Sequence, residues 1–148
     1  MASFVLTVVS PLSPDVAFDR MAAFERVTEW DPNTSSARRV DATIGLGTRF
    51  AIDTAFGGRT LRAEYRISAY EPPRLLVMES ALKNVHLRDE ITVVPDPEGC
   101  RMTYDARVMP KGAWRLAGPV LQVIFTRACR RTIGPLGAYL DGRTVSHT

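Results

Sequence analysis

Histidine and cysteine are scarce in this sequence, which removes several common kinds of active site. Its 148 residues include two histidines, His86 and His147, and two cysteines, Cys100 and Cys129. A Ser-His-Asp triad needs a well-placed histidine and a multi-histidine metal site needs several, so neither is expected. The cysteines are far apart and lack zinc-site spacing. We therefore predict no metal and no cofactor. A reduced, cytoplasmic protein is the simplest interpretation, although two cysteines also permit one disulfide.

The sequence also lacks a phosphate-binding loop, a membrane-spanning run and a nucleic-acid-binding pattern. Gly45-Leu46-Gly47 has neither the strand-to-helix setting nor the lysine that a nucleotide site requires. The apolar opening Phe4–Val9 follows no basic residue and is too short to span a bilayer, so it predicts a first strand and no transmembrane segment. The net charge is only +3 and no basic run is interleaved with aromatic residues, so no specific nucleic-acid partner is expected.

Length and composition are typical of one soluble domain. A chain of 148 residues is long enough to bury about 70% of the surface that its unfolded form exposes. The hydrophobic fraction of 45% and the charged fraction of 24% are ordinary, and no internal repeat is visible. We predict a single domain over residues 1–141, a flexible tail over residues 142–148, and a monomer or weak homodimer.

Two helical segments are expected after the first strand. Ser13-Pro14-Asp15 offers an N-cap, a proline at the first helical position and an acidic first turn, which together predict the start of a helix. A second, short helical turn is predicted from Val27 to Trp30, where Asp31-Pro32-Asn33 ends it. The buried stripe predicted for the first helix consists of Val16, Ala17, Phe18, Met21 and Phe24.

The middle of the chain is dominated by strand patterns separated by turn residues. Gly57-Gly58, Glu71-Pro72-Pro73 and Asp96-Pro97-Glu98-Gly99 are typical turns, so neighbouring strands should pair antiparallel. With the first strand, these segments predict a sheet of about seven strands. The predicted segments are 37–42, 48–56, 59–70, 75–81, 87–94 and 101–108.

Alternation along these strands assigns side chains to the two faces of the sheet. Phe50 and Ile52 share one face of their strand, and Met102 and Tyr104 share one face of theirs, while the polar residues between them should face water. His86 falls in phase with charged neighbours and is predicted on the wet face. The sheet is therefore expected to have one face in water and one face covered by helix.

A long amphipathic helix is predicted to end the chain near Leu140. Gly118-Pro119 predicts a restart after a preliminary turn, and Gly134-Pro135 predicts a kink near the end. A curved antiparallel sheet that grips one long helix often leaves a space between the two layers, so an internal pocket is expected. The apolar stripe of this helix consists of Trp114, Ala117, Leu121, Ile124, Phe125, Ala128, Leu136 and Leu140.

The order of elements and several local motifs resemble the helix-grip fold, an α+β fold shared by START and Bet v 1-like proteins of the SRPBCC superfamily. The likeness covers roughly residues 3 to 141 and is greatest for the polyketide cyclase/dehydrase and lipid-transport branch. The motifs that carry it are Val16 and Phe18, Trp30 with Pro32, Gly47-Thr48-Arg49-Phe50, Gly57-Gly58, Tyr70-Glu71-Pro72-Pro73-Arg74 and Gly99-Cys100-Arg101-Met102-Thr103-Tyr104.

This resemblance implies a hydrophobic cavity between the sheet and the last helix, which family members use to carry lipids, sterols or aromatic polyketides, or in some cases to catalyse cyclisation or dehydration. Fold alone does not decide between these roles. Our first hypothesis is a carrier or sensor of a small hydrophobic or amphipathic ligand, and the second is a polyketide cyclase or dehydratase. The predicted ligand-contact residues are Phe50, Ile52, Tyr65, Met78, Asp89, Met102, Tyr104, Trp114, Leu121 and Phe125.

Asp89, Tyr65 and Tyr104 are the candidates for chemistry. Asp89 alternates in phase with Leu87 and Ile91, so it should point inward with them, where a carboxylate is costly unless it is paired or protonated. It is then a ligand partner or an acid with a raised pKa; alternatively it lies wet, or paired with an arginine, at a strand end. The tyrosines either offer their hydroxyls to a ligand or simply fill the core.

The last helix also carries a basic flank, which supports a third hypothesis of an interaction protein. Lys111, Arg115, Arg127, Arg130 and Arg131 lie mostly off the apolar stripe. Such a flank could contact acidic lipid headgroups or an RNA backbone. It could equally be a solvated helix face.

Overall fold

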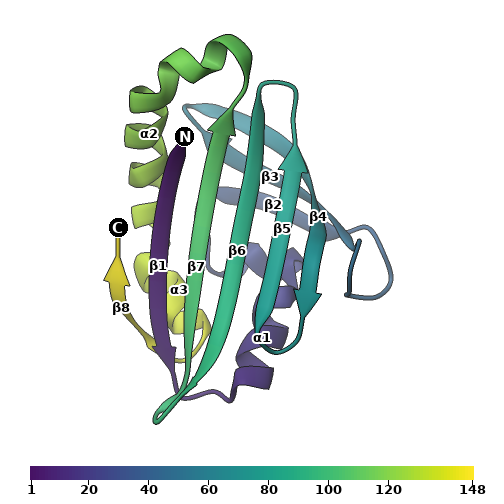
Figure 1. The fold of residues 1–148 in the computed structure, drawn as a ribbon, viewed down its shortest axis with the longest axis vertical. Coiled ribbons are helices and arrows are strands. Elements are labelled where there is room, and N and C mark those ends of the chain that lie inside the picture. The colour runs from purple at the N-terminus through teal and green to yellow at the C-terminus, as the bar shows by residue number, and fades with distance from the viewer.

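The sheet and helices follow the helix-grip order in a computed structural model that describes residues 1–148. Eight antiparallel strands form one curved sheet in the order β2-β3-β4-β5-β6-β7-β1-β8, one strand more than predicted. Figure 1 shows α1 at one end of this sheet and α2 beside β1 near the other end. The elements are β1 (Ala2–Ser10), α1 (Pro14–Ala22), the 3-10 helix η1 (Phe24–Glu29), β2 (Thr34–Arg39), β3 (Arg49–Phe56), β4 (Arg59–Glu71), β5 (Leu75–Ala81), β6 (Val85–Asp96), β7 (Gly99–Pro110), the 3-10 helix η2 (Gly112–Ala117), α2 (Gly118–Arg130), α3 (Ile133–Tyr139) and β8 (Arg143–His147).

The predicted meander of antiparallel strands is confirmed, with turns where the sequence places them. Gly57 and Gly58 join β3 to β4 with φ angles of +59° and +80°, which suit the tight hairpin turn that glycine favours. The predicted strand at residues 37–42 instead begins at Thr34. Asp31 explains this shift, because its carboxylate accepts hydrogen bonds from the Asn33 amide at 2.9 Å and the Thr34 hydroxyl at 2.8 Å and so turns the chain into the strand early.

The end of the chain is a strand, so the prediction of a flexible tail is wrong. Strand β8 pairs with β1 over Leu6 to Val9, and Thr148 exchanges two backbone hydrogen bonds with Val5. Gly142 makes this pairing possible, because a Cβ at that position would lie 2.1 Å from the Val9 carbonyl oxygen. Only glycine allows the chain to pass so close to β1 as it enters β8.

The long C-terminal helix predicted from the sequence is divided into η2, α2 and α3. The predicted restart at Gly118-Pro119 is confirmed, since α2 begins there. The second break lies at residues 131–132 rather than at Gly134-Pro135. Pro135 explains the break, because it has no N–H to donate to the carbonyl of Arg131, and the hydroxyl of Thr132 instead donates to the Cys129 carbonyl at 2.6 Å.

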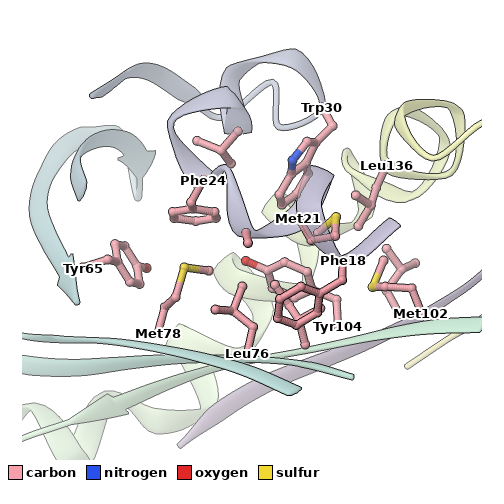
Figure 2. Close-up of a cluster of buried hydrophobic side chains, with 14 of the residues drawn as sticks. Phe18, Met21, Phe24, Trp30, Tyr65, Leu76, Met78, Met102, Tyr104 and Leu136 are labelled. Carbon is pink, nitrogen blue, oxygen red and sulfur yellow. The ribbon is translucent and has the colours of Figure 1, made fainter. Parts of the chain in front are cut away.

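The main core lies beneath α1 and η1. The Ser13 side chain caps α1 as predicted, accepting a hydrogen bond from the Val16 amide at 3.3 Å, but Val16 itself is 44% exposed and does not belong to the buried stripe. Phe18 and Met21 of α1 are fully buried over the sheet. Figure 2 shows these side chains facing the sheet residues Leu76 and Met102. This end of the molecule is closed by packing, which leaves any internal space under α2.

Candidate functional site

Two adjoining cavities lie between the sheet and the C-terminal helices. The outer cavity has a volume of about 730 Å³ and the inner cavity about 130 Å³. Some residues line both, so the two spaces are neighbours. The shared residues are Phe56, Leu61, Leu87 and Val108. Volumes of about 300–1,000 Å³ are usual for small-molecule sites, and the outer cavity falls in that range.

The outer cavity lies between the β3–β4 hairpin and the segment η2–α2. Trp114, Leu121 and Ile124 supply its helical wall, and Gly57 of the hairpin lies opposite Ile124. The helix gives this wall because residues three and four apart share one face. The other residues that line the outer cavity are mostly apolar, and the polar ones are Arg59, Thr60 and Asn84. The space between the hairpin and the helix therefore suits an apolar ligand body.

The inner cavity contains a buried carboxylate. Asp89 is 8% exposed, and alternation along β6 points it inward with Leu87 and Ile91 as predicted. Tyr104 on the neighbouring strand β7 donates a 2.7 Å hydrogen bond to Oδ2 of Asp89. No hydrogen bond from the protein reaches the other oxygen, Oδ1. An arginine-paired Asp89 is therefore excluded, whereas Oδ1 opens onto the cavity, since it is not among the fully buried atoms that lack a partner.

Burial makes Asp89 a weak acid. Removal from water raises its pKa from 3.8 to about 7, against the opposing effect of the Tyr104 hydrogen bond, and the nearby charges of Asp31 and Asp105 raise it further. Burial and the neighbouring carboxylate also hold the phenol pKa values of Tyr65 and Tyr104 well above their usual range, so both remain neutral. Near neutral pH the site therefore contains a carboxyl group close to half ionisation beside two phenols that can donate hydrogen bonds.

Aromatic contacts hold the walls of the inner cavity in place. The Trp30 ring lies edge-on to Tyr104 with ring centroids 5.5 Å apart, and Phe24 meets Tyr65 in the same way at 5.5 Å. Figure 2 shows Phe24 and Trp30 facing Tyr65 and Tyr104 across this space. The phenols are therefore fixed in position by η1 and by the chain that follows it.

Helix α2 covers the cavities without being buried itself. None of its residues is fully buried, although Leu121, Phe125 and Cys129 pack against the core. Two polar contacts attach it: the Gln122 amide exchanges two 3.0 Å hydrogen bonds with the backbone of Ser3, and the Asn33 amide donates to the Ala128 carbonyl at 2.8 Å. These contacts hold α2 to β1 and to the chain before β2, leaving the side toward the β3–β4 hairpin lined only by side chains of the outer cavity.

The predicted contact residues fall into three groups. Ile52, Tyr65, Asp89, Tyr104 and Phe125 line the inner cavity, and Trp114 and Leu121 line the outer one. Phe50, Met78 and Met102 line neither; they are fully buried in the core. The prediction that these three border the ligand space is wrong, because α1 and η1 fill the space above them, as the contact between the Phe24 and Phe50 rings at 5.8 Å shows.

Several cavity residues were not among the predicted contacts. Leu87 could have been found, since it alternates with Asp89, and Ile124 lies in the predicted helical stripe. Trp30 and Asn33 line the inner cavity from the segment after η1, and no periodic pattern marks residues of a loop. Their positions depend on the way the chain folds back over the sheet.

Other kinds of site are not formed. None of the helices is both long enough and apolar enough to cross a membrane. No group of three or more His, Cys, Asp or Glu side chains is placed to hold a metal ion. Cys129 lines the inner cavity, but burial raises the pKa of its thiol to about 12, so it is not an activated nucleophile.

Comparison with known proteins identifies a matching family and several proteins of similar fold. The family model described as polyketide cyclase/dehydrase and lipid transport matches residues 1–141. No curated protein sequence is significantly similar to the chain. A START superfamily protein from Mycobacterium smegmatis superposes with a TM-score of 0.74 at 12% identity, covering 95% of this chain and 96% of that one. Ara h 8.0201 gives a TM-score of 0.65 at 16% identity, with 94% and 97% coverage.

A biosynthetic protein is also similar in fold. The di-domain ARO/CYC protein BexL of the BE-7585A biosynthetic pathway has a TM-score of 0.72 at 17% identity, covering 95% of this chain and 50% of the di-domain chain. This chain therefore corresponds to about half of BexL. At such low identities these likenesses establish the helix-grip fold and leave activity to be argued from the site.

Proposed function

The chain belongs to the polyketide cyclase/dehydrase and lipid-transport family, and from this premise we propose that it binds an amphipathic small molecule, as a carrier or sensor. The apolar body of the ligand occupies the outer cavity, and its polar group reaches Asp89 in the inner cavity. The observation that carries the proposal is the free Oδ1 of a buried carboxylate on the wall of a largely apolar space. Oδ1 is not among the fully buried atoms that lack a partner, so it opens onto the cavity, where a hydrogen-bond donor of a ligand can reach it.

The electrostatics favour a ligand that donates a hydrogen bond. When ionised, Asp89 accepts hydrogen bonds from hydroxyl or amine groups. A ligand carboxylate would be repelled by the charges of Asp89 and Asp31, which both line the inner cavity, while the one cation in that lining, Arg107, is paired with Asp105 at 3.0 Å. An engineered cavity of about 150 Å³ in another protein holds benzene, so the inner cavity is large enough for one ring of a phenol or a terminal hydroxyl group. The preferred ligands are therefore hydroxylated lipids or phenolic polyketides.

Native mass spectrometry of the purified protein and a thermal-shift panel test this proposal. The panel compares a long-chain alcohol, the fatty acid of the same length and a phenolic polyketide. A ligand that binds only the folded protein raises its melting temperature, and we expect the alcohol and the phenol to do so above pH 7 while the fatty acid does not. If nothing co-purifies and no compound raises the melting temperature, the binding proposal is wrong.

A pair of variants on α2 locates the ligand. Phe125 lines the inner cavity, whereas Val123 is 63% exposed on the same helix. Phe125→Ala should weaken binding as well as lower stability, and Val123→Ala should change neither by much. Equal effects of the two variants on ligand affinity would place the ligand elsewhere.

The contact between Asp89 and Tyr104 favours a second candidate, a polyketide cyclase. In an aldol cyclisation, ionised Asp89 would take a proton from the carbon between two ketones, and that carbon would attack a second carbonyl carbon of the same chain. Tyr65 would donate a hydrogen bond to the oxygen that gains negative charge, since the one hydroxyl proton of Tyr104 is already donated to Asp89, and that oxygen then receives the proton from Asp89. A carboxyl group with a pKa of about 7 is suited to both transfers.

Asp89→Asn separates the two candidates, because it removes the titrating proton with little change of shape. If the protein is a cyclase, turnover of a poly-ketone should fall about 100-fold or more while binding is retained. If it is a carrier, no cyclised product should form with either protein. Product analysis by mass spectrometry after incubation with a linear poly-ketone distinguishes these results.

A further inference from the structure

The segment η2–α2 has a second apolar face, which points away from the cavities. Leu116, Val120 and Val123 are 90%, 60% and 63% exposed, and their spacing places them along one side of the segment. Leu121, Ile124 and Phe125 occupy the adjoining, cavity-facing side. A helix that is apolar on both sides is ordinarily buried, yet none of the α2 residues is buried. The outer face therefore lacks a partner within the chain.

The charge around this face has one sign. From Ala106 to Leu140 the sequence contains six lysine or arginine residues and no aspartate or glutamate. Arg115 lies beside the exposed leucine, and Arg127 continues the line of Val120 and Val123 along the helix. The partner of this surface must accept apolar side chains and carry negative charge beside them.

The same surface adjoins the mouth of the outer cavity. Trp114 lines that cavity and is 52% exposed. The Lys111 ammonium donates to the Leu82 carbonyl at 2.8 Å, which places it near the exposed Lys83, and Arg59 is part of the cavity lining. One cation thus lines the outer cavity and two more lie next to its lining residues Asn84 and Pro110, on the side of the molecule that exposes the Trp114 ring.

We propose that the outer face of η2–α2 docks on an anionic lipid surface. Leu116, Val120 and Val123 enter the boundary between headgroups and acyl chains, while Arg115 and Arg127 lie against the lipid phosphates. The mouth of the outer cavity then faces the bilayer. This inference does not depend on the identity of the cavity ligand, because Leu116, Val120 and Val123 do not line either cavity.

Two other partners fit the surface less well. A second copy of the chain packed through this face about a two-fold axis would bring the basic residues of α2 against their own equivalents, with no acidic residue between Ala106 and Leu140 to neutralise them. A nucleic acid would satisfy the arginines but would leave Leu116 and Val120 in water, since its outer surface is made of phosphates. Only an anionic lipid surface accommodates both the exposed apolar side chains and the basic residues.

Sedimentation of the full chain with vesicles tests the proposal. We expect binding to equimolar phosphatidylcholine and phosphatidylglycerol vesicles, little binding to phosphatidylcholine alone, and release at high salt. Arg115→Glu should weaken binding about fivefold or more, since one basic residue at a lipid surface contributes about that factor. Leu116→Ser should also weaken binding, and the emission of exposed Trp114 should shift to shorter wavelength when vesicles are added to the native protein.

Two matched controls are available at other places on the surface. Arg74→Glu reverses the same charge in the β4–β5 turn, and Leu46→Ser removes a leucine that is 73% exposed in the loop before β3. Neither should change vesicle binding. Three results overturn the proposal: no vesicle binding, equal binding to neutral vesicles, or equal loss of binding in the controls.

The alternative partners have their own outcomes. Binding of single-stranded RNA that Arg115→Glu abolishes and Leu116→Ser leaves unchanged would identify a nucleic-acid surface and overturn the proposal. A dimer that Val120→Asp dissociates in sedimentation equilibrium would identify a second copy and overturn it as well. Failure of vesicle binding would leave the cavity proposal intact, because ligand-induced thermal shifts are measured without lipid.

Discussion

The hydroxyl of Tyr104 donates a 2.7 Å hydrogen bond to Oδ2 of Asp89 inside the protein, and no lysine or arginine bonds to the carboxylate. One neutral donor compensates only part of the cost of burying a carboxylate. The remaining cost appears as a pKa of about 7 instead of 3.8. An acidic residue in such a position lowers stability above neutral pH, and natural proteins commonly accept that loss where function requires it.

Asp89→Asn should stabilise the protein above pH 7. Between pH 3.8 and about 7 the unfolded chain has released the Asp89 proton while the folded chain retains it, so the free energy of unfolding falls as pH rises through this window. The asparagine variant has no such proton and should show a flatter profile. Above pH 7 the free energy of unfolding of the variant should exceed that of the native protein by up to about 4 kcal/mol, the equivalent of the pKa shift.

Urea denaturation of both proteins on either side of neutral pH measures this effect. Asp19→Asn is the control, because Asp19 is exposed on α1 and its replacement should change stability by no more than about 0.5 kcal/mol at either pH. An Asp89→Asn variant that is no more stable than the native protein above neutral pH would mean that water reaches Asp89 and that its pKa is ordinary. The measurement therefore tests the burial of this carboxyl group independently of any ligand.

Tyr104→Phe should raise the pKa of Asp89 further. The tyrosine hydroxyl stabilises the carboxylate, so its removal leaves burial and the charge of Asp31 unopposed. The side-chain carboxyl carbon of Asp89 reports the titration by NMR. Tyr65→Phe is the matched control, because Tyr65 lines the same cavity without a hydrogen bond to Asp89. A fall in the pKa after Tyr104→Phe would contradict the geometry.

The fold was predictable because local signals agree with one another. The Gly57-Gly58 turn, the Ser13 cap and the alternation along the strands each specify a local conformation, and together they define the sheet and the first helix. The strand β8 was not predictable, because its residues lack an alternating pattern and its pairing depends on the close approach of Gly142 to Val9. That contact exists only once the chain is folded.

The site was predictable only where it lies on regular elements. Alternation placed Tyr65, Asp89 and Tyr104 on the inner face, and helical spacing placed Leu121 and Phe125. The same patterns could not separate cavity-lining residues from the fully buried residues of the core, since both kinds are apolar and face inward. What separates them is the position of α1 and η1 over the sheet, which is a matter of tertiary packing.

Gly142→Ala should detach β8 from β1. The added Cβ would lie 2.1 Å from the Val9 carbonyl oxygen, so the backbone must move, at a cost of about 1–3 kcal/mol by analogy with overpacked cores. Hydrogen exchange should then accelerate at Val5 and Thr148, whose backbone groups bond to each other. Gly134→Ala is the control, because a Cβ there meets no atom within 4 Å. Unchanged protection at Val5 would show that the strand tolerates the substitution.

Leu121→Trp should close the outer cavity without weakening the fold. Leu121 faces this cavity, and its volume of about 730 Å³ has room for an indole ring, so the overpacking strain of a filled core should not arise. Ligand affinity, measured by the thermal shift, should fall at least about tenfold, a loss of about 1.4 kcal/mol. Val120→Trp introduces the same ring at a position that is 60% exposed and should leave affinity unchanged. If both variants bind normally, the ligand does not occupy the outer cavity. The polar group of the ligand must then reach Asp89 by another route.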